Sequence, residues 1–185
     1  MPTPKGATLT MDPKSPPQAG ANLLFLREEE IRAAQDMLFF AYRDFTNAAD
    51  VILEELELGR AHHRALHFIG RNSGMSVGEL LDLLRITKQS LARVLNALIA
   101  QGFVAQAQGR SDRRQRLLTL TPAGQDLERR LFERQRERLV AAYREAGGAS
   151  VEGFRRVMRA IMDETARKYM DRNEHPARDS RPRQI

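Results

Sequence analysis

The sequence predicts a mainly α-helical protein with one small β-hairpin. Two short, capped helical patterns lie between residues 76 and 102, and two strand-like patterns follow between residues 103 and 120. Long apolar patterns with helical spacing lie on both sides of this region. We therefore expect a helix–helix–hairpin unit, flanked by terminal helices whose apolar faces pack against partner helices.

The composition limits the class of protein. At 185 residues the chain fits one domain, or a small domain with arms. Cysteine is absent, which excludes disulfides, thiolate metal sites and cysteine-based redox switches. No apolar run approaches the ~20 residues of a membrane span and no signal-peptide pattern is present, so we expect a cytoplasmic protein without a membrane partner.

Positive charge is concentrated in the central region. The whole chain carries a net charge of +6, from 30 Lys and Arg against 24 Asp and Glu. Residues 74–124 hold seven basic and three acidic side chains, a balance of +4, whereas residues 25–73 hold six and nine, a balance of −3. Such an uneven distribution is typical of a protein that binds nucleic acid through its central region.

The N-terminal part predicts an arm followed by two helices. Residues 1–22 contain five prolines and no apolar periodicity, which predicts a disordered arm of unassigned role. From about Leu26 to Leu58 apolar residues recur at three- and four-residue steps, which predicts one long helix that Gly59 ends. Residues 60–72 then predict a second helix.

Three of the four histidines lie in that second helix. His63 and His67 are four residues apart on one helical face, a spacing that can chelate a metal ion. No cysteine and no second helical histidine pair is available to complete a site, so we predict no metal site. We expect these histidines to be partly buried polar residues near a dimer interface or a ligand pocket.

The central helices have well-defined ends. Ser76 and Glu79 form a capping box, in which each side chain accepts a hydrogen bond from an unpaired backbone N–H group. Thr87 supplies a second N-cap, and Gly102 suits the left-handed residue that ends the following helix. Two helices with so short a turn between them predict a helix-turn-helix.

The exposed face of the second helix carries polar and basic side chains and no acid. Such side chains suit phosphates and base edges in a DNA major groove, where Gln can pair with adenine and Arg with guanine. Taken alone, the pattern fits a solvated helix face equally well. The candidate DNA-binding residues of this recognition helix are Thr87, Lys88, Gln89, Ser90, Arg93 and Asn96.

An arginine-rich hairpin follows. Phe103–Ala107 and Arg116–Leu120 predict two strands, joined by a loop that contains glycine and far more arginine than a turn requires. A hairpin of this kind beside a helix-turn-helix makes a winged helix, whose tip can enter a narrow minor groove; the alternative is an exposed charged turn. The candidate wing residues are Arg110, Asp112, Arg113, Arg114 and Arg116.

The C-terminal part predicts two further helices. Thr121 and Pro122 start a helix that ends at Gly147-Gly148, and Ser150 caps a last helix whose apolar stripe continues to Tyr169. We therefore predict five segments: a disordered arm (1–22), N-terminal support and dimerisation helices (23–73), the winged helix-turn-helix (74–121), C-terminal dimerisation helices (122–171) and a flexible tail (172–185).

Residues 76–124 resemble the MarR family of winged-helix bacterial transcription regulators. The matching motifs are LRITKQSLAR at 84–93, LIAQGFV at 98–104, and Asp112-Arg113-Arg114 followed by LTLTPAG at 118–124. Within that family, the end of the wing is similar to the PetP-like branch. The chain departs from the family pattern at Arg85, where a glycine is frequent, and at Gly109, where an acid is frequent.

The resemblance implies a homodimer with interlocked terminal helices that binds a pseudo-palindromic operator in double-stranded DNA. It also implies a pocket for a small-molecule effector between the dimerisation helices and the winged helix-turn-helix. Candidate lining residues, which also fit a purely structural role in the core, are Phe40, Phe45, His63, His67 and Phe68.

The predicted function is thus a dimeric, sequence-specific and ligand-responsive repressor without a cofactor. The alternative is a nonspecific architectural DNA-binding protein, which would show a steep salt dependence and little sequence preference. An enzyme is not predicted, because the sequence shows no nucleophile–base pair, glycine-rich phosphate loop or complete metal site.

Overall fold

The structure is a computed structural model that describes residues 24–109 and 112–174. The chain divides into two units, Met1–Tyr42 and Arg43–Ile185, and the long helix α1 (Glu28–Glu55) runs through the division. The predicted disordered arm and most of the predicted tail lie outside the described residues.

The first unit consists, where it is described, of a 3-10 turn (Leu24–Leu26) and the N-terminal half of α1. Glu28 lies in the first turn of α1, where the helix dipole favours an acid, and pairs with Arg32 at 2.6 Å. Within this described part, Ala34 is the only side chain from Phe25 onward that is not exposed. The exposed large apolar residues are Phe25, Leu26, Ile31, Met37, Leu38, Phe39, Phe40 and Tyr42.

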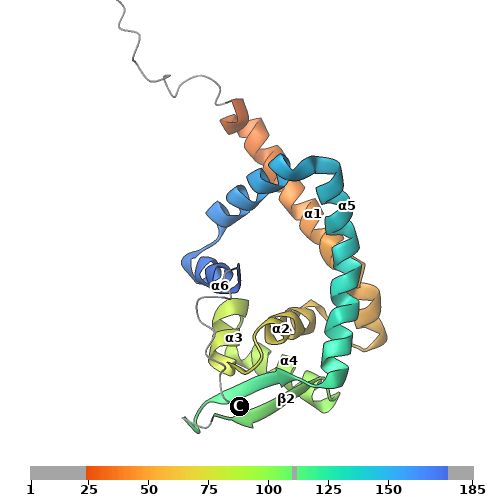
Figure 1. The fold of residues 1–185 in the computed structure, drawn as a ribbon, viewed down its shortest axis with the longest axis vertical. Helices are drawn as coiled ribbons and strands as arrows, with labels where there is room; N and C mark the ends of the chain where they lie inside the picture. The colour runs from red at the N-terminus through yellow and green to blue at the C-terminus, as the bar shows by residue number, and fades with distance from the viewer. Residues whose placement is uncertain (1–23, 110–111, 175–185) are drawn as a thin grey trace, which may run out of the picture. The chain divides into compact units, whose positions relative to one another are not determined.

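The second unit holds the remaining elements, so the predicted mainly helical fold with a small sheet is confirmed. Figure 1 shows α2, α3 and α4 gathered beside the strands. The helices are α2 (Arg60–Arg71), α3 (Val77–Leu84), α4 (Lys88–Ala100), α5 (Pro122–Ile161) and α6 (Glu164–Glu174). The strands are β1 (Met75–Ser76), β2 (Val104–Gln108) and β3 (Arg116–Leu120).

The connection between α1 and α2 differs from the prediction that Gly59 ends the first helix. Helix α1 ends at Glu55, because Glu57 adopts a left-handed conformation (φ 54°) and the Leu58 N–H turns back to the Leu53 carbonyl at 2.8 Å. Gly59 instead caps α2, and its N–H donates to His62 Nδ1 at 2.9 Å.

The sheet contains a strand that the sequence did not predict. Its order is β1-β3-β2, with both pairings antiparallel, and Met75 of β1 pairs with Leu118 of β3. Strand β2 begins at Val104, one residue later than predicted, whereas β3 has the predicted bounds. A two-residue strand such as β1 is too short to show any periodicity, so tertiary pairing alone reveals it.

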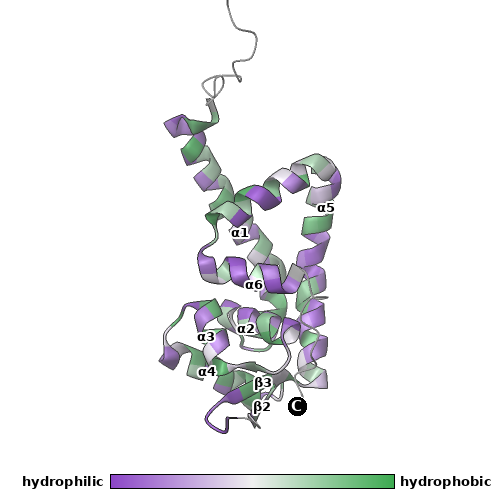
Figure 2. Ribbon diagram, turned by 60° about the vertical axis from the view of Figure 1, so that its left-hand side comes forward, coloured by the Kyte–Doolittle hydropathy of each residue, from purple (hydrophilic) through white to green (hydrophobic). Residues whose placement is uncertain are grey.

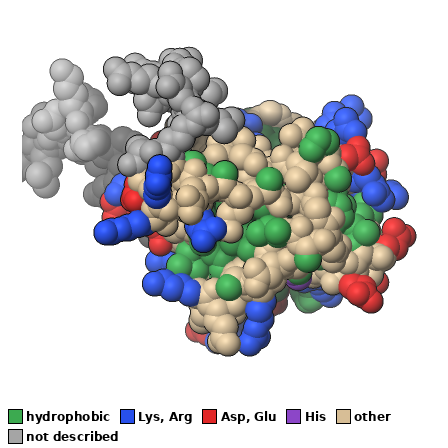
Figure 3. Space-filling view, turned by 90° about the horizontal axis from the view of Figure 1, so that it is seen from below, with side chains coloured by type: hydrophobic (Ala, Val, Ile, Leu, Met, Phe, Trp, Pro, Cys, Tyr) green, Lys and Arg blue, Asp and Glu red, His purple; other side chains and the backbone are tan. Residues whose placement is uncertain are grey.

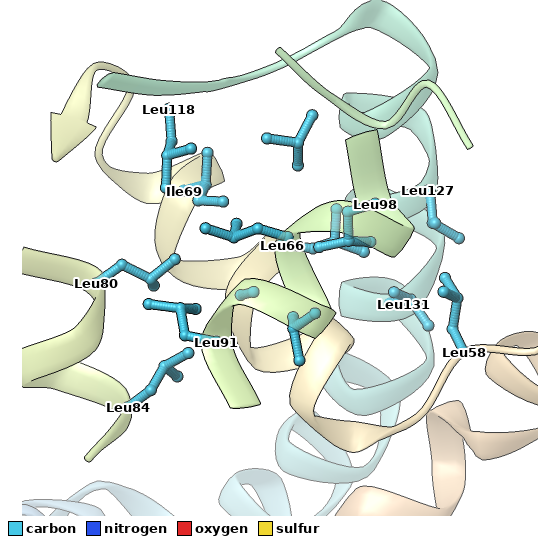
Figure 4. Close-up of a cluster of buried hydrophobic side chains, with 14 of the residues drawn as sticks. Leu58, Leu66, Ile69, Leu80, Leu84, Leu91, Leu98, Leu118, Leu127 and Leu131 are labelled. Carbon is cyan, nitrogen blue, oxygen red and sulfur yellow. The ribbon is translucent and has the colours of Figure 1, made fainter. Parts of the chain in front are cut away.

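One hydrophobic core joins α2, α3, α4, β3 and α5 (Figure 4). Four residues of α4 point into it, so each turn of this helix is anchored: Leu91, Val94, Leu95 and Leu98. The fully buried side chains are Leu53, Leu66, Ile69, Leu80, Leu91, Leu98, Leu118 and Leu131. Burial of each such side chain contributes about 1.5–3 kcal/mol, which holds α4 in one orientation.

The C-terminal helices break in two places. Gly147 has non-helical backbone angles (φ 77°, ψ 162°), as predicted for the break at this glycine. A second break at Met162 was not predicted, and the single last helix expected through Tyr169 is therefore wrong. Asp163 causes the break, because its Oδ1 accepts the Ala166 N–H at 2.8 Å and starts a new helix, α6.

None of the helices in residues 24–109 and 112–174 is long and apolar enough to cross a membrane.

Candidate nucleic-acid interface

The helix-turn-helix is formed by α3, a three-residue turn and α4. Ser76 Oγ accepts the Glu79 N–H at 3.1 Å while Glu79 Oε2 accepts the Ser76 N–H at 2.8 Å, which confirms the predicted capping box. The turn passes through Arg85, which adopts a left-handed conformation (φ 50°, ψ 43°). This backbone explains why glycine is favoured at such a position, and the turn nevertheless forms with arginine.

The start of α4 is capped as predicted. Thr87 Oγ1 accepts the Ser90 N–H at 3.1 Å and donates to Ser90 Oγ at 2.9 Å. Gly102 follows the helix with φ 76°, which confirms its predicted left-handed role. All six candidate residues of the recognition helix are exposed: Thr87, Lys88, Gln89, Ser90, Arg93 and Asn96.

The wing is the hairpin of β2 and β3, whose last strand pair joins Gln108 to Arg116. Asp112 organises its loop: the Asp112 carbonyl accepts the Gln115 N–H at 3.0 Å, and Asp112 Oδ1 accepts the Arg114 N–H at 2.9 Å. Asp112 therefore shapes the backbone that presents Arg114. The candidate Arg110 lies outside the described residues.

The return from the wing is clamped onto the end of α4. Thr121 Oγ1 donates to the Gly102 carbonyl at 2.6 Å and accepts the Gly124 N–H at 3.0 Å. A Cβ atom at Gly124 would lie 2.0 Å from the Phe103 carbonyl oxygen. The threonine and the glycine of the LTLTPAG segment thus fix the wing to the recognition helix.

The exposed cations of this region are open to a partner. Figure 3, viewed from below Figure 1, shows Lys and Arg side chains standing out around the margins of this face. The ion pairs of residues 24–109 and 112–174 include none formed by the following cations: Lys88, Arg93, Arg113, Arg114 and Arg116. By contrast, Arg129 and Arg136 of α5 pair with nearby acids.

The candidate pocket residues fall in both units of the chain. Phe40 belongs to the first unit, whereas the other four belong to the second. His67 and Phe68 contact each other edge-to-face with ring centroids 5.3 Å apart, and His63, His67 and Phe68 are all half-buried on α2. The described part of the chain contains no cluster of three or more His, Cys, Asp or Glu residues with metal-binding geometry.

The electrostatic environment keeps His67 neutral. Burial, followed by the charges of Arg71 and His63, lowers the pKa of His67 to about 4. Burial also raises the pKa of Glu128, whose Oε1 lies 3.6 Å from His67 Nδ1. At neutral pH the contact therefore involves an uncharged imidazole and is not an ion pair.

An open cleft of about 700 Å³ lies elsewhere, between the second half of α1 and α5. Ala48, Val51 and Ile52 form its apolar part, and Arg130 and Arg134 are among its charged residues. None of the candidate pocket residues lines this cleft.

The comparisons with known proteins agree with this geometry. A model of the MarR family matches residues 56–115. The HTH-type transcriptional regulator PetP of Rhodobacter capsulatus is 51% identical over 150 residues, which cover 81% of this chain and 90% of that protein. The chain belongs to the MarR family. The predicted resemblance, including its PetP-like branch, is confirmed.

Solved structures of MarR-family proteins share the fold. A SlyA-like transcription regulator from Listeria monocytogenes has a TM-score of 0.60 and 19% sequence identity, with 77% of this chain and 91% of that chain covered. NadR, solved in complex with 4-hydroxyphenylacetate, has a TM-score of 0.56 and 19% identity, with 80% and 97% covered. Membership of the MarR family makes this protein a DNA-binding transcription regulator and not an enzyme.

Sequence reasoning missed some residues that support the interface. Met75 begins the unpredicted strand β1, and Asp163 caps α6 and pairs with Arg85. Gly124 belongs to the LTLTPAG motif, but its role, which is to permit the close approach to Phe103, was not predicted. Asp163 did leave a signal, because Asp is a preferred N-cap residue, but the apolar periodicity continuing through residues 151–162 obscured it.

Proposed function

We propose that this MarR-family protein is a dimeric, sequence-specific and ligand-responsive repressor. The observation that carries the proposal is the exposed surface of α4 and the wing, which presents polar and unpaired basic side chains from two rigidly joined elements. Phosphate contacts from such side chains position a protein on DNA, and contacts to base edges specify the sequence.

The proposed DNA contacts of the recognition helix α4 differ from those of the wing. Gln89, Ser90 and Arg93 lie on the exposed surface in the first two turns of α4 and would read base edges in the major groove, whereas Lys88 would bind a phosphate. Thr87 would keep the helix start in shape through its cap. Arg113 and Arg114 of the wing would reach the minor groove.

The proposed dimer rests on exposed apolar side chains. A monomer rarely leaves so many of them in water, and a two-fold dimer is the commonest arrangement that covers them. In the second unit the exposed large apolar residues are Val51, Ile99, Phe132, Leu139, Phe154, Val157 and Ile161. A two-fold dimer would present two recognition helices to a pseudo-palindromic operator, one DNA turn or a small multiple apart.

The proposed effector is a small molecule that lowers DNA affinity through a coupling free energy between two sites. The half-buried residues Phe45, His63, His67 and Phe68, together with Phe40, remain its proposed site. Because NadR was solved with 4-hydroxyphenylacetate, aromatic carboxylates are the first compounds to test.

Fluorescence anisotropy tests the proposal directly. The DNA upstream of the protein's own gene is compared with scrambled DNA of equal length at two salt concentrations. We expect a preference of ~10³-fold or more. Equal affinities that fall together with salt would favour the architectural alternative.

The Gln89→Ala variant identifies a base contact. If Gln89 reads a base, its replacement weakens operator binding by roughly 1–3 kcal/mol and leaves scrambled DNA unaffected. The matched control is Gln35→Ala, which removes the same side chain from an exposed position of α1, outside α4 and the wing. Equal losses on both DNAs would assign Gln89 to a nonspecific contact.

A further inference from the structure

Helix α6 is held against the helix-turn-helix and against the end of α2. It is mostly hydrophilic (Figure 2), and none of its described side chains is buried. At one end, Arg85 Nη1 lies 2.6 Å from Asp163 Oδ2. Near the middle of α6, Tyr169 meets the end of α2: Asn72 Nδ2 donates to Tyr169 Oη at 3.0 Å, and the rings of Phe68 and Tyr169 meet edge-to-face at 5.3 Å.

The first of these contacts acts on the turn itself. Arg85 is the left-handed residue between α3 and α4, and it lies two residues before the Thr87 cap. A left-handed conformation costs a non-glycine residue about 1–2 kcal/mol, so the surrounding contacts must hold this backbone in place. An anchor on the Arg85 side chain therefore acts close to the start of the recognition helix.

Asp163, the partner of Arg85, lies at the corner between the end of α5 and the start of α6. Asp163 also caps α6 through its other oxygen, while Arg167 donates to the carbonyls of Arg159 and Ala160 at 3.1 and 2.8 Å. Arg159 and Asp171 form an ion pair across the same corner. These contacts join the end of α5 to α6, so the two helix ends move together.

We propose that the Arg85–Asp163 pair is a positioning contact that ties the arrangement of the recognition helix to the α5–α6 corner. The proposal rests on the proposed DNA-reading function, and it makes Arg85 a residue that acts through the turn and not through DNA. An exposed ion pair stabilises a fold by at most about 1 kcal/mol, so its main effect is on the placement of the turn. The corner carries Ile161, one of the apolar residues of the proposed dimer surface.

The test uses the full-length protein and three variants. Arg85→Ala removes the cation. Asp163→Asn removes the charge but keeps the oxygen that caps α6, and the double variant combines both changes. Glu164→Gln is the matched control, because it breaks the exposed Glu164–Lys168 pair of the same helix without reaching the helix-turn-helix.

Anisotropy on operator and scrambled DNA is combined with amide hydrogen exchange of residues 85–91. We expect each single variant to lose about fivefold in operator affinity, to keep its affinity for scrambled DNA, and to exchange faster at these amides. The double variant should lose no more than either single variant, since both changes break one contact. The control should match the wild type.

Other outcomes overturn the proposal. If Arg85→Ala weakens binding to both DNAs while Asp163→Asn does not, Arg85 contacts phosphate itself. If the wild type prefers its operator and all variants behave like it, the positioning role is wrong although the regulator function stands. A wild type without sequence preference refutes the proposed function, and the exchange experiment, which needs no DNA, still decides whether the pair orders the turn.

Discussion

At the residue scale, the interface depends on individual close contacts that do not admit a larger side chain. The clearest is Gly124 against the Phe103 carbonyl, where an added Cβ would lie at 2.0 Å. We expect Gly124→Ala to lower the free energy of unfolding by about 3 kcal/mol, because backbone must move to admit the methyl group. Gly153→Ala is the control, since its Cβ would meet nothing within 4 Å; it should leave stability unchanged or raise it by up to ~1 kcal/mol. Chemical denaturation measures both.

A second residue-scale prediction concerns acid sensitivity. The folded-state pKa of His67, about 4, lies below the ordinary value of 6.5, so the unfolded chain binds the proton more readily. The stability due to neutral His67 is therefore complete above pH 6.5 and is lost as the pH falls towards 4. Between pH 6.5 and 4, we expect the free energy of unfolding to fall by about 1 kcal/mol less in His67→Gln than in the wild type. This value is reduced because the His67 side chain is 41% exposed.

Denaturant unfolding of the wild type and His67→Gln between pH 4 and 7 measures the difference. Glu128, whose raised pKa acts in the opposite direction, contributes to both profiles. Parallel profiles would mean that His67 is not held neutral by its surroundings.

At the element scale, the wing and α4 act as one surface because Thr121 and Gly124 clamp them together. An arginine in the minor groove lies between the two phosphate backbones, and each phosphate that it neutralises should add roughly 0.9 to the magnitude of the slope of log affinity against log salt concentration. We therefore expect the double variant Arg113→Ala, Arg114→Ala to bind all DNA more weakly and to reduce that slope by about 2.

The matched control for the wing is Arg129→Ala with Arg136→Ala. It also removes two arginines, but both already pair with acids of α5. Its slope should equal that of the wild type when both are measured by salt titration. A wing variant with an unchanged slope would place Arg113 and Arg114 away from the phosphates.

At the scale of the whole molecule, the exposed apolar residues predict that DNA binding depends on a second copy of the chain. Val157 and Ile161 are 60% and 62% exposed and lie one helical turn apart. We expect Val157→Asp with Ile161→Asp to give a folded monomer in light scattering and to lose at least about 100-fold in operator affinity, because one half-site remains. Arg155→Asp changes the net charge by the same amount on another face of the helix and should stay dimeric. A dimeric double variant would exclude this face from the interface.

Much of the fold and of the candidate site could be predicted because the signals are local. The Ser76–Glu79 box, the Thr87 cap and the Thr121 cap join residues three positions apart, so the sequence itself contains both partners. The exposed polar face of α4 follows from the same local periodicity, since the buried positions are known once the helix is known.

Tertiary structure alone decided the contacts between distant residues. The pairing of Met75 with Leu118, the left-handed Arg85 held by Asp163, and the turn of α6 towards Asn72 all join segments that no local pattern relates. The physical reason is that helix starts are set by hydrogen bonds within one turn. The placement of one element on another depends on which surfaces become buried together, and only the folded chain brings those surfaces into contact.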